Sequence, residues 1–184
     1  MKNRLRMMRY MLVVVLASAT VYAGSKVAVQ AVDAAHWILK KSESYSENMK
    51  YSKTIPYMYL GYNQDGETSQ GVAMRSFKTY KRVTAMIALK RDNDKVVVDV
   101  VDIPDIGLIK DIKKQEKVLE ALKGIGGTVV QDASGKRHAI DAVTGATRYQ
   151  KRIYLYLNKM SEALLVEMGD DPGWTRTPVK AVSK

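Results

Sequence analysis

The seven residues Asp141–Thr147 form the segment whose residue types and spacing are best suited to chemistry. Gly145 and Ala146 are small, so a bulky phosphate group could approach the hydroxyl of Thr147 closely. We expect a helix to start just after Thr147, and the free N–H groups and dipole of a helix N-terminus favour a phosphate. Three basic residues follow, Arg148, Lys151 and Arg152, and they add positive charge. The segment therefore predicts a phosphate at Thr147.

A simpler interpretation is that Thr144 or Thr147 only caps the following helix. That interpretation explains a Thr and a Gly at these positions, but it does not explain the full set of seven residues. We therefore favour the functional interpretation and keep the helix cap as the alternative.

The pattern Asp-x-x-Thr-Gly-Ala-Thr at residues 141–147 resembles the flavinylation motif of the FMN-binding domain family. This family includes the extracytoplasmic subunits of the sodium-pumping quinone reductase and of the Rnf electron-transport complex. The resemblance implies that FMN is joined to Thr147 by a phosphoester bond, within a motif that also comprises Asp141, Thr144, Gly145 and Ala146. It further implies a flavin transferase as partner, which uses FAD as FMN donor and a magnesium ion. Asp141 would bind that ion or cap the loop.

A second segment, Asp102–Gly107, is similar to the family's Glu-Thr-Pro-Gly-Leu-Gly loop and keeps Pro104 and Gly107. Asp105 and Ile103 replace a Gly and a Thr of that loop. Tyr149 stands where many members have Ser or Thr. These departures leave Thr147 intact and alter the flavin contacts around it. The resemblance covers about residues 57–167.

Other residues with chemical potential have ordinary explanations. The chain has no Cys and two His, which excludes thiolate chemistry and Cys-based metal sites and leaves little room for a His-built site. We expect His36 to pack in a helix or lie on its surface, and His138 to lie on the surface. Tyr57, Tyr59 and Tyr62 could stack on a flavin, but aromatic residues in a half-buried strand more often belong to the core.

The elements that position these residues follow from the hydrophobic pattern, which predicts an α+β fold: an antiparallel β-meander packed by helices, with an N-terminal helix, as in FMN-binding domains. Strands are predicted at 57–62, 71–77, 82–90, 96–103 and 128–131, and helices at 26–41, 111–123 and 148–168. Gly124, Gly126 and Gly127 are interpreted as a helix end and a turn rather than a phosphate-binding loop, because they follow a helix.

The N-terminus has a basic stretch, an apolar stretch and then small residues, in the order of an export signal. We therefore assign residues 1–23 as a signal peptide; an uncleaved membrane anchor is the alternative. Residues 24–56 are assigned to the N-terminal helix and a connector, 57–168 to the FMN-binding domain, and 169–184 to a mobile C-terminal tail.

The formal net charge of +11 falls to +7 when residues 1–23 are removed. The basic residues are scattered among acidic ones, so we do not expect a nucleic acid partner. The sequence therefore predicts an extracytoplasmic flavoprotein that carries FMN and relays electrons between membrane or extracytoplasmic redox partners. Whether it is an enzyme by itself stays open. The alternative is a module of the same fold with non-covalent flavin or none, acting as a structural adaptor in a membrane complex.

Overall fold

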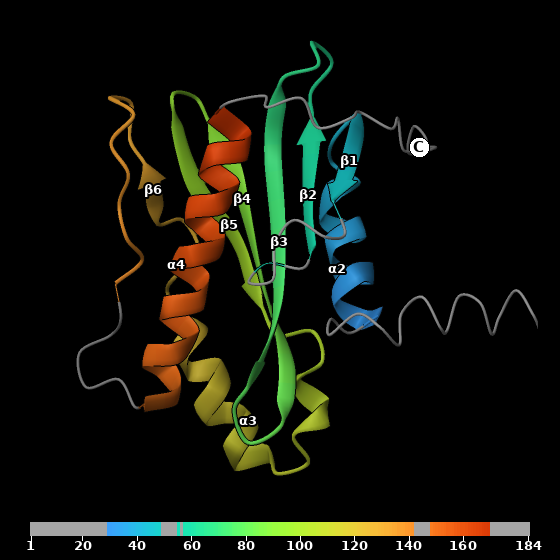
Figure 1. The fold of residues 1–184 in the computed structure, drawn as a ribbon, viewed down its shortest axis with the longest axis vertical. Helices are drawn as coiled ribbons and strands as arrows, with labels where there is room; N and C mark the ends of the chain where they lie inside the picture. Colours follow the sequence, from blue (N-terminus) through green and yellow to red (C-terminus); the bar gives the residue numbers. More distant parts are fainter. Residues whose placement is uncertain (1–28, 49–54, 56, 142–147, 170–184) are drawn as a thin grey trace, which may run out of the picture.

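The computed structural model of this chain describes residues 29–48, 55, 57–141 and 148–169 (Figure 1). The predicted signal peptide, the tail from residue 170 and the motif residues Thr144, Gly145, Ala146 and Thr147 lie outside the described residues. None of the described helices is long and apolar enough to cross a membrane.

The fold is an α+β fold built on one six-stranded antiparallel sheet (Figure 1). Every strand lies beside its neighbours in the chain, so the sheet is a meander, as predicted. The strands are β1 (Ser44–Asn48), β2 (Tyr57–Tyr62), β3 (Thr68–Lys78), β4 (Arg82–Asp92), β5 (Lys95–Asp102) and β6 (Val129–Gln131). Local turn chemistry supports this order. Between β2 and β3, the side-chain oxygen of Asn63 accepts hydrogen bonds from the N–H groups of Asp65 and Glu67.

Helices cover both faces of the sheet. The helix α4 (Arg148–Gly169) packs across β3 and β4 on one face, and α2 (Val29–Leu39) packs across the same strands on the other. Because side chains alternate along a strand, β3 supplies Ala73 and Phe77 to the core under α4, and Val72 and Met74 to the core under α2. The central strands are therefore buried on both sides.

One end of the sheet is closed by the segment after β5. It comprises a 3₁₀ turn η1 (Ile106–Leu108), the helix α3 (Ile112–Leu119) and a second 3₁₀ turn η2 (Glu120–Leu122). Asp111 caps α3 by accepting a hydrogen bond from the N–H of Lys114. Gly124 follows with a φ of 75°, which confirms that this glycine ends the helical segment rather than forming a phosphate-binding loop.

The structure differs from the prediction at the first strand. Residues 42–56 were expected to be a connector, but Ser44–Asn48 forms β1, the edge strand that pairs with β2. The polar sequence of β1 does not predict a strand, because an edge strand does not need a continuous apolar face. A contact between the hydroxyls of Ser46 and Tyr62 (2.8 Å) joins the two strands through their side chains as well.

Candidate functional site

The helix α4 begins at Arg148, the residue directly after the predicted acceptor Thr147. The chain that leads into the motif is held against the middle of this helix. The side-chain oxygen of Asn158 accepts a hydrogen bond from the N–H of Ile140 (2.7 Å), and its amide nitrogen donates to the Ile140 carbonyl (3.0 Å). Ile140 itself is buried, whereas Asp141 is exposed. The motif therefore starts from a fixed residue.

The first turns of α4 lie against the hairpin formed by the end of β3 and the start of β4. The guanidinium of Arg152 donates a hydrogen bond to the carbonyl oxygen of Lys78, the last residue of β3 (3.2 Å). Arg82, the first residue of β4, pairs with Lys78 across this hairpin. Basic side chains from two elements thus gather beside the N-terminal part of this helix.

Arg75 of β3 is a candidate ligand that the sequence analysis did not single out. Its guanidinium lies 4.0 Å from the centre of the Tyr156 ring, a favourable arrangement of a cation over an aromatic face. One guanidinium nitrogen, Nη1, is buried and has no hydrogen-bond partner within the part of the chain that the structure describes. A buried cationic donor usually has a partner, and the partner of Arg75 Nη1 is not among the described residues.

FMN carries a phosphate dianion and a large aromatic ring system, and the residues around the start of α4 suit both. Arg75, Arg152 and Lys151 provide positive charge, and the N-terminus of a 22-residue helix favours an anion. Tyr156 and Tyr80 are half-buried aromatic residues on the same side. The chemistry of these donors therefore fits a flavin phosphate.

The second predicted segment, around Pro104 and Gly107, is held to the sheet by Asp105. The Asp105 carboxylate accepts hydrogen bonds from the N–H (2.7 Å) and the hydroxyl (3.1 Å) of Thr84 in β4. Burial raises the pKa of the Asp105 carboxyl above its ordinary value, and the bonds from Thr84 oppose that rise only in part. Asp105, one of the two residues that depart from the family's loop, thus anchors the loop here.

Gly107 has no steric reason to be glycine in this structure. It lies at the surface, its φ is not positive, and a Cβ placed there would meet nothing within 4 Å. Pro104 and Gly107 lie at the same end of the sheet as the start of α4, with the β3–β4 hairpin between them. The fold brings the Asp102–Gly107 segment and the start of α4 to one end of the molecule without requiring a glycine at 107.

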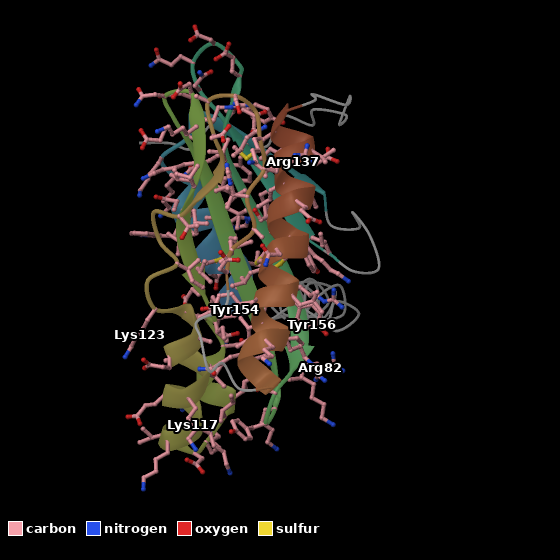
Figure 2. The ribbon with its side chains drawn as sticks, turned by 90° about the vertical axis from the view of Figure 1, so that its left-hand side faces the viewer. Arg82, Lys117, Lys123, Arg137, Tyr154 and Tyr156 are labelled. Carbon is pink, nitrogen blue, oxygen red and sulfur yellow. The ribbon has the colours of Figure 1, made fainter. Side chains whose placement is uncertain are left out.

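A separate hollow of about 570 Å³ lies farther along α4. It is lined by Arg137, His138 and Ala139 and by side chains of α4 between Asn158 and Val166. Of the predicted site residues that the structure describes, Pro104, Gly107 and Asp141, none lines it. Figure 2 shows Arg137 toward the end of the molecule opposite to Lys117. The α4 side chains that line the hollow thus lie ten or more residues beyond the first residue of the helix, Arg148.

The remaining candidates have structural roles. His138 is exposed, as expected, and its Nε2 lies 2.8 Å from the Asp132 carboxylate. Hydrogen bonds from Ser134 and His138 lower the pKa of Asp132. The three tyrosines Tyr57, Tyr59 and Tyr62 are core residues with at most 6% of their surface exposed. His36 lies in α2 against the rings of Tyr45 and Tyr59, which confirms a packed helix histidine.

No group of three or more His, Asp or Glu side chains among the described residues could hold a metal ion. Comparisons with family models, with curated proteins and with solved structures found no match to this chain. The functional assignment therefore depends on the residues themselves.

Proposed function

We propose that the chain is an extracytoplasmic flavoprotein that carries FMN on the hydroxyl of Thr147 and relays electrons between redox partners. The observation that carries the proposal is the motif at residues 141–147 directly before α4. The helix N-terminus and the basic side chain of Arg152 support it, because each would stabilise a phosphate at that place.

The modification would be made by a flavin transferase. A phosphoester bond forms between the Thr147 oxygen and the FMN phosphate, the pyrophosphate bond of FAD breaks, and AMP leaves. Bound FMN supplies one- and two-electron chemistry. The start of α4 and Arg152 would hold the phosphate, and Asn158 fixes the chain before the loop through Ile140.

The test is the intact mass of the exported chain made in a host that has the flavin transferase, followed by peptide mapping. Thr147→Ala should abolish the covalent flavin and leave a folded protein, whereas Thr147→Ser should keep part of the modification. Thr144→Ala is the matched control within the motif, and it should lower the yield without moving the site. Flavin on Thr144, or undiminished covalent flavin in Thr147→Ala, would show that the assignment is wrong.

A relay differs from a self-sufficient oxidoreductase in what it reacts with. The sequence has no nicotinamide-binding fingerprint, so the flavinylated protein should exchange electrons only with a redox partner. Rapid NADH oxidation by the purified protein alone would contradict this part of the proposal.

Gly107 has open space around it, so the described residues do not require the glycine that the family's loop has there. This favours a second candidate, a module of the same fold without covalent flavin that acts as an adaptor. A yellow colour that survives denaturation distinguishes the two candidates, because only a covalent bond keeps the flavin on an unfolded chain.

A further inference from the structure

The end of the molecule formed by residues 78–82 and 106–123, here called the basic tip, combines positive charge with exposed apolar side chains. It carries eight basic residues against three acidic ones, and all eight basic side chains are exposed. The basic residues are Lys78, Lys81, Arg82, Lys110, Lys113, Lys114, Lys117 and Lys123. Figure 2 shows Arg82, Lys117 and Lys123 at this end, on different sides of it.

Few of these charges are neutralised by neighbours. Lys114 pairs with Asp111 and Lys123 pairs with Glu120. Lys110, Lys113 and Lys117 form no ion pair with any residue that the structure describes. Such a surplus of unpaired positive charge attracts an extended anionic surface.

Two large apolar side chains project from the same tip. Leu108 is 50% exposed and Ile112 is 69% exposed. Lys110 lies between them in the sequence, and Lys113 follows Ile112. A single exposed apolar residue is ordinary. Two of them beside lysines combine apolar and basic side chains, the two kinds by which interfacial segments bind a lipid bilayer.

The turns at the opposite end of the sheet have a small surplus of acidic residues. The turns at residues 63–67, 92–95 and 132–137 lie there (Figure 1) and carry five acidic residues against three basic ones. The charge distribution would orient the molecule at an anionic membrane, with the basic tip toward the lipid and these turns away from it.

We propose that the basic tip docks on the surface of a membrane that contains anionic phospholipids, with Leu108 and Ile112 entering the interface. The proposal goes beyond the flavin function and does not depend on it. If both are correct, docking holds the start of α4 close to the bilayer, since Arg152 in its first turns contacts Lys78 of the tip.

The chain has no Cys, so one engineered cysteine can carry a single environment-sensitive dye. The full chain is labelled at Leu108→Cys or, as the control, at Asp65→Cys in the opposite end. Both are mixed with vesicles of phosphatidylcholine, with or without phosphatidylglycerol. We expect a blue shift of the dye at position 108 only with phosphatidylglycerol, reversed by high salt, and no shift at position 65. Both labelled chains carry the same residues 1–23, so binding of vesicles through that segment alone would act on both.

Charge variants test the electrostatic part. Lys113→Glu with Lys117→Glu should lower the ratio of docked to undocked dye at least about tenfold, because each lysine near an anionic surface contributes roughly a fivefold factor. Lys95→Glu with Lys136→Glu makes the same change in net charge at the opposite end and should leave the ratio nearly unchanged. Both pairs are exposed, and thermal unfolding by circular dichroism checks that each variant is folded.

Three results would overturn the proposal. One is no shift at position 108 with phosphatidylglycerol. Another is an equal loss in the two charge variants, which would mean general attraction without a defined tip. The third is binding of a glutamate-rich peptide at position 108 without binding of vesicles, which would make the tip an interface for an acidic protein.

Discussion

Among single residues, Asp105 is a buried carboxyl whose ionisation is coupled to the fold. It is buried, it receives two hydrogen bonds from Thr84, and burial raises its pKa. A carboxyl with a raised pKa in the folded state contributes stability below its ordinary value of about 4, and that contribution is lost as the pH rises through the raised pKa.

Asp105→Asn should therefore remove a pH-dependent destabilisation. The amide oxygen can still accept from the Thr84 N–H, and the amide nitrogen can donate to the Thr84 hydroxyl. The free energy of unfolding of Asp105→Asn relative to the wild type should increase as the pH rises above about 4. Urea unfolding at several pH values measures it. Asp105→Ala is the control, and it should cost about 1–3 kcal/mol because both Thr84 donors lose their acceptor. A difference between Asn and wild type that does not change with pH would contradict the assignment.

The sequence alone reveals a motif of adjacent residues, but it does not reveal contacts between residues that are far apart in the chain. The pattern at 141–147 could be found without a structure, because all its members are adjacent in the sequence. Arg75 and Asp105 could not be assigned a role, because their contacts to Tyr156 and Thr84 join residues far apart in the chain. The sequence identified Asp105 only as a departure from the family's loop, whereas the structure shows that its carboxylate holds that loop to β4.

At the scale of elements, Asn158 links α4 to the segment before the motif through two hydrogen bonds to Ile140. Asn158→Ala should lower the free energy of unfolding by about 1–3 kcal/mol, because both backbone groups of Ile140 lose their partner. If Thr147 carries the flavin, the yield of flavinylation should fall as well, since the start of the loop is no longer fixed. Lys159→Ala, at the exposed next position, is the matched control for both measurements. Equal yields in the two variants would mean that this anchor does not position the acceptor.

The element that the sequence did not predict, β1, can be tested through its junction with α2. A Cβ on Gly61 of β2 would overlap the hydroxyl of Ser42, which lies between α2 and β1, and would lie 3.2 Å from Leu39. Gly61→Ala should therefore destabilise the fold by about 1–3 kcal/mol. Ser42→Gly in the same chain should recover part of that loss, because it removes the atoms in the way. Gly107→Ala adds the same methyl group in open space and should be nearly neutral. No recovery in the double variant would mean that residues 42–48 do not lie on β2 as described.

Most other elements could be predicted because their patterns are local. The alternation in β4 and the helical spacing of α4 each repeat over many residues, and β4 and α4 have nearly the predicted bounds. The strand β1 is short and polar, with the sequence SYSEN, and only its pairing with β2 makes it a strand. Sequence patterns alone do not show such a pairing.

In the molecule as a whole, the sheet has a hydrophobic core on each face. The folding unit should therefore include α2 and β1, which precede residue 57. The core under α2 contains Tyr59, Val72, Met74 and Met86, all at most 1% exposed. A chain that began at residue 57, the predicted start of the FMN-binding domain, would lack α2 and β1. It would expose this core to water and leave β2 as an unpaired edge.

We therefore expect a chain starting at residue 24 to fold and a chain starting at residue 57 to fail. Each large buried side chain contributes about 1.5–3 kcal/mol, and a domain of this size is stable by only about 5–15 kcal/mol, so exposing the α2 face removes most of the available stability. Size-exclusion chromatography with light scattering should show a monomer for the longer chain and aggregates for the shorter one. Urea should unfold the longer chain in one cooperative transition and give the shorter chain none. A monomeric shorter chain with the same cooperative midpoint would show that α2 and β1 are accessory to the fold rather than part of it.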